Sequence, residues 1–199
     1  MRSRHRKQLK RERIKVREKG VELRVLRGEE LNDGEWEALW KFYMSTMERK
    51  WSIPYLNKGF FSVMREKLFH RVVATFAYRD NEPVAGALFF TRGENLYGRY
   101  WGALEQMEYL HFELCYYLPL EWCFDNGINN FQAGAQGEHK IKRGFLPETC
   151  HSAHWLRHPG LAEAVEAHVR EEGDYQRAEQ AELEQFSPFR KRTDDQDEP

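Results

Sequence analysis

The sequence predicts a mixed α/β fold in which helices flank a central sheet. Two alternating stretches joined by Asp80-Asn81 indicate a β-hairpin, and stretches with helical periodicity and capping residues lie before and after it. From His111 to Phe145, a nearly all-apolar helix, a glycine, a short strand and a small-residue loop follow one another. Such a unit packs a helix against a sheet and leaves the end of the strand open to ligands.

The N-terminal segment is strongly basic. Residues 1–20 contain ten Lys and Arg and two Glu, which leaves 21 basic and 30 acidic residues for the rest of the chain. Residues 2–19 predict a basic helix that ends at Gly20, with only Leu9, Ile14 and Val16 as a thin apolar stripe. Two interpretations are open: a solvated helix lying on an acidic domain, or an arm that contacts the phosphates of nucleic acid or lipid headgroups.

The helices and strands before residue 109 are predicted from the periodicity of apolar residues and from capping residues. Expected strands cover Val21–Leu26, Val72–Tyr78, Pro83–Thr91 and Leu96–Gly102, and expected helices run from Asn32 or Asp33 to Met47 and, capped by Asn57, over Lys58–Leu68. Gly86 lies inside the second hairpin strand, which predicts a bulge or a close approach of another group.

The core helix is expected over Tyr109–Asn126, because this stretch is apolar on nearly every face and is too short and too charged to span a bilayer. Trp122 is expected among its buried residues. Pro119 should kink the helix and free the carbonyl of Cys115.

The chain after this helix is expected to build the rest of the fold. Gly127 provides a left-handed C-cap, and residues 129–133 predict a strand. Residues 134–137 have no bulky side chain that would block a ligand. A closing strand is expected at Thr149–Leu156, followed by an amphipathic helix over Gly160–Leu183.

Length and composition limit the classes of protein to which this chain can belong. The 199 residues are expected to form a basic helical arm (1–20), one α/β domain (21–186) and an acidic disordered tail (187–199). Three cysteines without a CxxC pair favour a reduced cytoplasmic compartment over a disulfide framework or a zinc site, and no metal site is expected. The basic N-terminus has no following apolar run, so neither a signal peptide nor a transmembrane segment is expected.

Three strings carry a resemblance to a known family. HFELCYY, FQAGAQGEHKIKRGFLP and SAHWL resemble the second half of predicted N-acyltransferases of the FemAB-like, or peptidoglycan biosynthesis/recognition, family, within the GNAT superfamily. The resemblance extends roughly from Arg4 to Lys191. Fem-type aminoacyltransferases are similar in outline, with a helix, a glycine, a strand and then an element seen here as Lys142-Arg143-Gly144-Phe145. The resemblance implies a GNAT-like mixed central sheet flanked by helices.

The resemblance also implies a function. The chain is expected to transfer an acyl or aminoacyl group from acyl-CoA or aminoacyl-tRNA to a small-molecule or cell-wall precursor amine, with no permanently bound cofactor. Such proteins usually carry two GNAT-like domains, and this chain has room only for the second, with residues 1–20 similar to the linker. The alternative is therefore a non-catalytic half of a split protein, which binds nucleic acid such as tRNA or a partner GNAT-like domain.

Acid–base catalysis needs His, Glu or Tyr within hydrogen-bond reach of the substrate. Glu138 and His139 are catalytic candidates because small residues precede them at a strand end, although an ordinary solvated helix start would look the same. His111 and Glu113 are further candidates at the mouth of the core helix. Residues two apart on a helix project about 200° apart, so only one of the two can face the site.

A second group of candidates would bind donor or substrate: Tyr100, Trp101, Gln136, Gly137, Lys140, Lys142 and Arg143. The three cations would hold a phosphate or a carboxylate, or they form a basic surface turn. Tyr100 and Trp101 would lie beside the donor gap between two splayed parallel strands, or they fill the sheet core. Trp51 and Tyr55 would line an acceptor groove, as the resemblance implies, or pack between helices.

The sequence does not decide between acyl-CoA and aminoacyl-tRNA as the donor. The usual acetyl-CoA signature before the core helix is missing, since Arg99-Tyr-Trp-Gly102-Ala-Leu104 begins like it but ends in leucine. This departure leaves room for an aminoacyl-tRNA donor.

Overall fold

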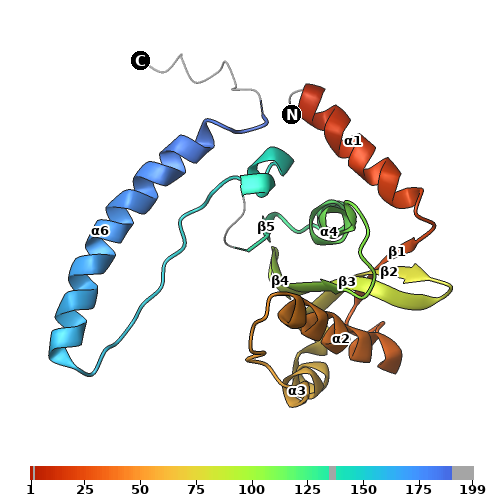
Figure 1. Cartoon of the computed structure of the whole chain (residues 1–199), viewed down its shortest axis with the longest axis horizontal. Coiled ribbons are helices and arrows are strands. Elements are labelled where there is room, and N and C mark those ends of the chain that lie inside the picture. The colour runs from red at the N-terminus through yellow and green to blue at the C-terminus, as the bar shows by residue number, and fades with distance from the viewer. Residues whose placement is uncertain (2, 135–137, 190–199) are drawn as a thin grey trace. The chain divides into compact units, whose positions relative to one another are not determined.

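The computed structural model describes residues 1, 3–134 and 138–189 and divides the chain into two compact units. The larger unit comprises residues 7–136, and the smaller comprises residues 1–6 and 137–199. The larger unit is built on one sheet with the strand order β1-β2-β3-β4-β5 (Figure 1). Its strands are β1 (Glu22–Arg27), β2 (Val72–Arg79), β3 (Glu82–Arg92), β4 (Asn95–Ala103) and β5 (Asn130–Gln132).

The sheet is mixed, as expected. Neighbouring strands from β1 to β4 are antiparallel, whereas β5 is parallel to β4. The β2–β3 hairpin turns at Asp80 and Asn81, whose φ angles of 51° and 64° are the left-handed values that this type of turn requires. The hairpin and the five strands predicted before residue 134 are confirmed to within two residues at each end.

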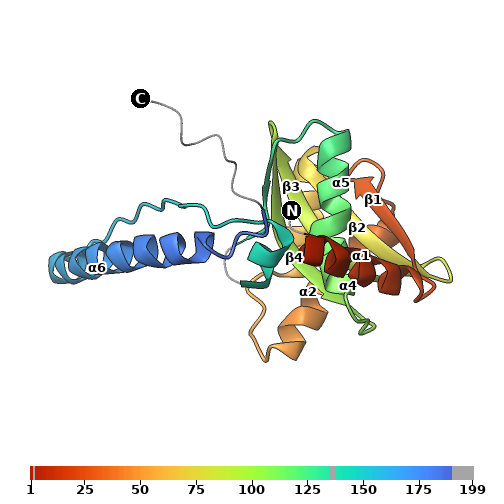
Figure 2. The same ribbon diagram turned by 90° about the horizontal axis from the view of Figure 1, so that it is seen from above.

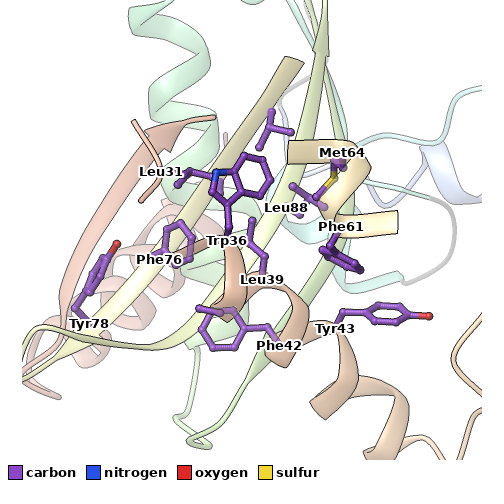
Figure 3. Packing of buried hydrophobic residues seen from close by; sticks show 13 residues of the cluster. Leu31, Trp36, Leu39, Phe42, Tyr43, Phe61, Met64, Phe76, Tyr78 and Leu88 are labelled. Atoms are coloured by element: carbon purple, nitrogen blue, oxygen red, sulfur yellow. The ribbon is translucent and has the colours of Figure 1, made fainter. Parts of the chain in front are cut away.

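Helices α2 (Asp33–Arg49) and α3 (Lys58–Leu68) cover one face of the sheet, which we call the aromatic face. Asn32 and Glu35 form a capping box at the start of α2, and the Asn57 side chain caps α3. Figure 3 shows the buried cluster between these helices and the strands, with Phe42 and Tyr43 among its least exposed members. A Cβ atom at Gly86 would lie 2.9 Å from both the Phe42 ring and the Thr75 carbonyl oxygen, so the expected close approach is confirmed.

The opposite face, which we call the π-helix face, is covered by one helical segment built from three parts. These are α4 (Leu110–Phe112), the π-helix η2 (Glu113–Tyr117) and α5 (Leu118–Asp125). Within η2, the Leu118 N–H donates to the Glu113 carbonyl instead of the Leu114 carbonyl. Pro119, the next residue in π register, has no N–H to offer. The Thr75 hydroxyl of β2 therefore donates to the Leu114 carbonyl at 2.7 Å and satisfies it.

The structure adds the Leu114 carbonyl, satisfied by a side chain, to what was expected near Pro119, and the freeing of the Cys115 carbonyl stays a prediction. One expectation for this helix needs correction, because the helix is not buried all round. Phe124 is 77% exposed, and Trp122 is half-buried with the Arg27 guanidinium 5.3 Å from its ring. Gly127 takes the predicted left-handed conformation, with φ of 68°.

Helix α1 (Ser3–Arg17) is basic, as predicted, and from Lys7 onward it belongs to the larger unit. There it packs on the π-helix face, where α1 and α5 are both visible in Figure 2. Val16 is buried beside Leu110 and Leu114. The buried Glu12 carboxylate accepts a hydrogen bond from the Tyr117 hydroxyl. One side of this basic helix is therefore fixed to the core.

The smaller unit contains the 3-10 helix η3 (Glu138–Arg143) and α6 (Pro159–Glu184). The strand expected at Thr149–Leu156 is wrong: the described segment 145–156 contains no strand. Instead it lies alongside α6, where the Gln180 side chain contacts the Thr149 hydroxyl at 3.0 Å and the Pro147 carbonyl at 3.5 Å (Figure 1). A strand needs a neighbour that pairs with its backbone, and here side chains take that place. Most of the expected disordered tail lies outside the described residues.

Candidate active site

The parallel strands β4 and β5 part soon after they meet. They pair only from Asn95 opposite Asn130 to Tyr97 opposite Gln132. Strand β4 continues to Ala103, and within the described residues its positions 98–103 have no strand partner on that side. This open edge presents backbone N–H and C=O groups to an extended ligand.

A β-bulge distorts β4 at the start of this open edge. Leu88 of β3 lies opposite Tyr100, and the next residue, Phe89, lies opposite Gly98, so Arg99 is the extra residue. Bulges re-aim side chains and are common next to active sites. The Arg99 guanidinium lies 4.9 Å from the centroid of the Tyr100 ring.

Trp101 joins helices from both faces of the sheet at this edge. The His111 ring of α4 lies 4.6 Å from the Trp101 ring, between centroids, and 5.4 Å from the Tyr116 ring. On the aromatic face, the Thr46 hydroxyl donates to the Trp101 carbonyl at 2.7 Å. The Arg49 guanidinium lies 5.6 Å from the Trp101 ring centroid. The half-buried Trp101 thus links the imidazole on one side to a cation on the other.

A second pair of polar groups lies next to Trp101. The hydroxyls of Tyr100 and Tyr55 are 2.6 Å apart, and the Tyr43 ring packs edge-on against both rings. Burial, followed by the hydrogen bond to Tyr55, raises the pKa of Tyr100 well above its ordinary value. The Tyr100 hydroxyl therefore stays protonated at neutral pH, which suits a hydrogen-bond or proton donor. Tyr55 contacts the core and remains 65% exposed, so both of its predicted roles have support.

The Glu113 side chain contacts Arg13, whereas the His111 ring contacts Trp101. The Glu113 carboxylate is buried and accepts hydrogen bonds from Arg13 of α1, at 2.8 Å from Nη2 and 3.1 Å from Nε. Desolvation raises the pKa of Glu113 despite the attraction of Arg13. Arg13 also binds Glu121 of α5, whose pKa it lowers. The geometry gives Glu113 a role in attaching α1 to the π-helix, and its predicted catalytic role stays a prediction.

The remaining candidates, apart from Gln136, belong to the smaller unit. Gln136 and Gly137 lie outside the described residues, as does the side chain of Glu138. In η3, the Arg143 Nη1 donates to the His139 carbonyl at 2.9 Å, which ties the two ends of this short helix together. Partial burial, together with the nearby charge of Arg143 and Lys140, lowers the pKa of His139.

The cations of η3 differ in exposure. Arg143 is only 8% exposed, Lys140 is half-buried and Lys142 is exposed. Lys142 is therefore the cation of this set whose side chain is most accessible to a ligand. The structure brings together Trp101 and His111 in the larger unit, and His139 and Arg143 separately in the smaller one. Tyr100 is next to Trp101 in β4, but its side chain packs on the aromatic face.

Sequence reasoning did not assign a role to Thr46, Arg49 or Arg99. Thr46 lies within a long helix and carries no sequence signal. Arg49 and Arg99 each lie close in sequence to a tryptophan or tyrosine, in Arg49-Lys50-Trp51 and Arg99-Tyr100-Trp101. Such cation–aromatic proximity is a usable signal, but only the fold shows that the two segments meet at the same open edge.

Within the described ranges, the structure shows neither a helix suited to crossing a bilayer nor a group of three or more metal-ligating side chains. Within the described residues, Cys115, Cys123 and Cys150 form no disulfide. Burial raises the pKa of Cys123 to about 11, so this thiol is not a nucleophile at neutral pH.

Comparison with known proteins identifies a family and a fold. The model of the FemAB-like family, described as peptidoglycan biosynthesis/recognition, matches residues 1–191, which confirms the resemblance noted in the sequence. A search of curated proteins finds no match to the chain.

Solved acetyltransferase structures resemble this chain. An aminoglycoside acetyltransferase, meta-AAC0020, from an uncultured soil metagenomic sample and in complex with trehalose, has a TM-score of 0.50 at 8% identity, over 70% of this chain and 98% of that chain. A possible acetyltransferase from Clostridium difficile 630 has a TM-score of 0.50 at 11% identity, over 69% of this chain and 99% of that chain. The expected GNAT-like fold is therefore confirmed.

Proposed function

The chain belongs to the FemAB-like family of peptidoglycan biosynthesis/recognition proteins, and on this premise we propose that it is an N-acyltransferase acting on a cell-wall precursor or a related small-molecule amine. The observation that carries the proposal is the parting of β4 and β5. Two parallel strands that pair over three positions and then separate leave an open strand edge beside Trp101 and His111.

The open edge suits the arm of an acyl donor. An extended chain with amide groups, such as that of an acyl-CoA thioester, can pair with the backbone of residues 98–103 as an additional strand would. The half-buried Trp101 ring forms an apolar wall there. Such a site holds the acyl group next to both His111 and Tyr100 without a permanently bound cofactor.

The proposed reaction follows from these groups. The acceptor, bound as an ammonium ion, gives one proton to the His111 imidazole, and its nitrogen then attacks the acyl carbonyl carbon, forming a C–N bond and an oxyanion. Collapse of this intermediate breaks the bond to the sulfur or oxygen of the donor carrier. The Tyr100 hydroxyl, hydrogen-bonded to Tyr55, protonates that leaving atom, and the resulting phenolate takes the second proton from the nitrogen of the new amide. Glu113 and Arg13 hold the helix that carries His111.

The set in η3 has a separate proposed role. Lys142 is exposed, and Lys140 and His139 are half-buried, so we assign to these residues, with Gln136 and Gly137, the binding of an anionic group of a donor or substrate. Glu138 and His139 remain alternative catalytic residues. Variants of His111 and His139 distinguish these assignments.

An aminoacyl-tRNA donor is the second candidate, favoured by α1. Lys7, Lys10 and Arg11 are exposed on this helix, on which Val16 and Glu12 face the core. A cationic helix face binds phosphates of nucleic acid, with an affinity that falls steeply with salt. The same face would serve the alternative, non-catalytic role in binding nucleic acid.

The test is acyl transfer by the full chain, measured by mass spectrometry with acetyl-CoA or aminoacyl-tRNA as donor and a panel of amines. We expect His111→Ala to lower turnover on the order of a hundredfold or more, with an unchanged melting temperature. His70→Ala, at an exposed histidine distant in sequence, serves as the control. Loss of activity in His139→Ala alone would move the chemistry to η3, and no transfer with either donor would leave the non-catalytic alternative.

A further inference from the structure

Two arginines lie against consecutive aromatic residues at the open edge of β4. The Arg99 guanidinium lies 4.9 Å from the Tyr100 ring centroid, and that of Arg49 lies 5.6 Å from the Trp101 ring centroid. Tyr100 packs on the aromatic face and the Trp101 ring on the π-helix face. Arg49 also binds the Thr46 hydroxyl, which donates to the Trp101 carbonyl, so both cations lie at one short stretch of the β4 edge. They come from different elements, since Arg49 ends α2 and Arg99 is the bulged residue of β4.

Arg49 is held in place by its own helix. Its Nε donates to the Ser45 carbonyl at 3.1 Å, and its Nη2 donates to the Thr46 hydroxyl at 3.0 Å. That hydroxyl in turn donates to the Trp101 carbonyl. A guanidinium has five N–H donors, and these contacts use two of them, so three remain for a ligand. A planar group fixed in this way loses little freedom when it binds a carboxylate or phosphate through two parallel hydrogen bonds.

Within the described residues, neither guanidinium is neutralised by a carboxylate. Throughout the part of the protein that the structure describes, no carboxylate forms an ion pair with Arg49 or Arg99, whereas Arg13, Arg24, Arg65 and Arg79 all have such partners. Both side chains are exposed, and Lys50 adds a third cation next to Arg49. Stacking on aromatic rings directs these cations without satisfying their N–H groups.

We propose that Arg49 and Arg99 form an anion-binding subsite for the acceptor, and that the acceptor amine therefore carries a carboxylate or a phosphate. This inference rests on the proposed acyltransferase function and names its substrate class. The arginines border Tyr100 and Trp101. Tyr100 and the His111 that lies against Trp101 are the groups assigned to proton transfer. An acidic group on the acceptor, a few bonds from its amine, can reach the arginines. The phosphates of coenzyme A lie a long arm away from its acyl group.

The test compares amines that differ only in the acidic group, by calorimetric titration of the full chain with and without coenzyme A. The pairs are L-lysine against cadaverine, and phosphoethanolamine against ethanolamine. The first pair tests a carboxylate and the second a phosphate. We expect the anionic member of at least one pair to bind roughly tenfold more tightly or better, because charge-assisted bidentate contacts are the strong ones.

The variants are Arg49→Gln and Arg99→Gln, with Arg92→Gln, an exposed arginine at the end of β3, as a control of equal charge change. We expect the first two to abolish the preference for the anionic member and the control to keep it. Equal binding of both members in both pairs, binding of neither member, or a preference that survives both variants overturns the subsite. If the two variants weaken only the binding of coenzyme A, the subsite is also overturned, because the arginines would then bind the donor.

The two proposals fail differently. An enzyme that acylates neutral and anionic amines at equal rates keeps the acyltransferase function and removes the subsite. Anion-selective binding that depends on Arg49 and Arg99, with no acyl transfer, keeps the subsite and removes the enzyme.

Discussion

The two faces of the central sheet are packed by different means. On the aromatic face, α2 and α3 bury a continuous apolar cluster (Figure 3). The hydrogen bond from the Tyr78 hydroxyl to Glu35 at 2.5 Å is a buried polar contact on this face. On the π-helix face, buried carboxylates of Glu12 and Glu113 and the Thr75 hydroxyl all require partners from other elements.

The difference shows which kind of packing tolerates change. Apolar burial depends on area and shape, so the aromatic face is stabilised by many interchangeable contacts. A buried charge is stable only with its partner, and Arg13 and Glu113 are 100 positions apart in the chain. The π-helix face therefore depends on a few specific pairs, and it is also the face that positions His111.

The largest effect is expected from a cavity on the aromatic face. Phe42→Ala should lower the free energy of unfolding by about 3–5 kcal/mol, because the side chain is 1% exposed and its removal leaves a void. Denaturant titration measures this change. Phe124→Ala, at a residue that is 77% exposed, should stay within about 0.5 kcal/mol of the parent protein. Equal losses in both variants would show that the helix carrying Phe124 is covered by another surface.

The ion pair on the π-helix face should have the next largest effect. Arg13→Ala leaves the buried Glu113 carboxylate without its cation and should cost about 3 kcal/mol near neutral pH. Arg11→Ala, at an exposed position of the same helix, is the matched control and should change little. The measurement is the midpoint and slope of denaturant unfolding for both variants.

The cost of Arg13→Ala should also depend on pH. Burial raises the pKa of Glu113, so the folded state binds a proton there more readily than the unfolded state, and the contribution of this group to stability is lost as pH rises through its folded pKa. Without Arg13 this pKa rises further, and the deficit grows with pH. Below about pH 4 the carboxyl is protonated in both proteins, so the difference between variant and parent should shrink there. A difference that stays constant with pH would exclude the carboxylate as its cause.

The smallest of these effects is expected at the π-turn. Thr75→Val keeps the shape of the side chain but removes the hydroxyl that satisfies the Leu114 carbonyl, at a cost of about 1–3 kcal/mol. Thr75→Ser keeps the hydroxyl and loses only a methyl group. If serine is as destabilising as valine, then packing rather than the hydrogen bond supports the π-turn. Either result sharpens the contrast between the two faces.

Local signals in the sequence determined much of this fold. Caps at Asn32 and Asn57, the Asp80-Asn81 turn and the glycine at 127 each fix a backbone conformation within a few residues, so the element boundaries could be predicted. The strings HFELCYY and FQAGAQGEHKIKRGFLP likewise identified the family. For the candidate site, the sequence singled out His111, Tyr100 and Trp101 one by one.

What only the tertiary structure decided involves residues far apart in the chain. In η2, the Leu114 carbonyl accepts its hydrogen bond from Thr75, which is 39 positions away in the chain. No local pattern in the helix predicts this contact. The segment 145–156 has the composition of a strand but no strand neighbour to pair with. Arg49 and His111 lie against Trp101, and Arg99 lies against the adjacent Tyr100, because a sheet edge and two helices from opposite faces converge there. Periodicity and caps describe one element at a time, whereas a site is made by the contacts between elements.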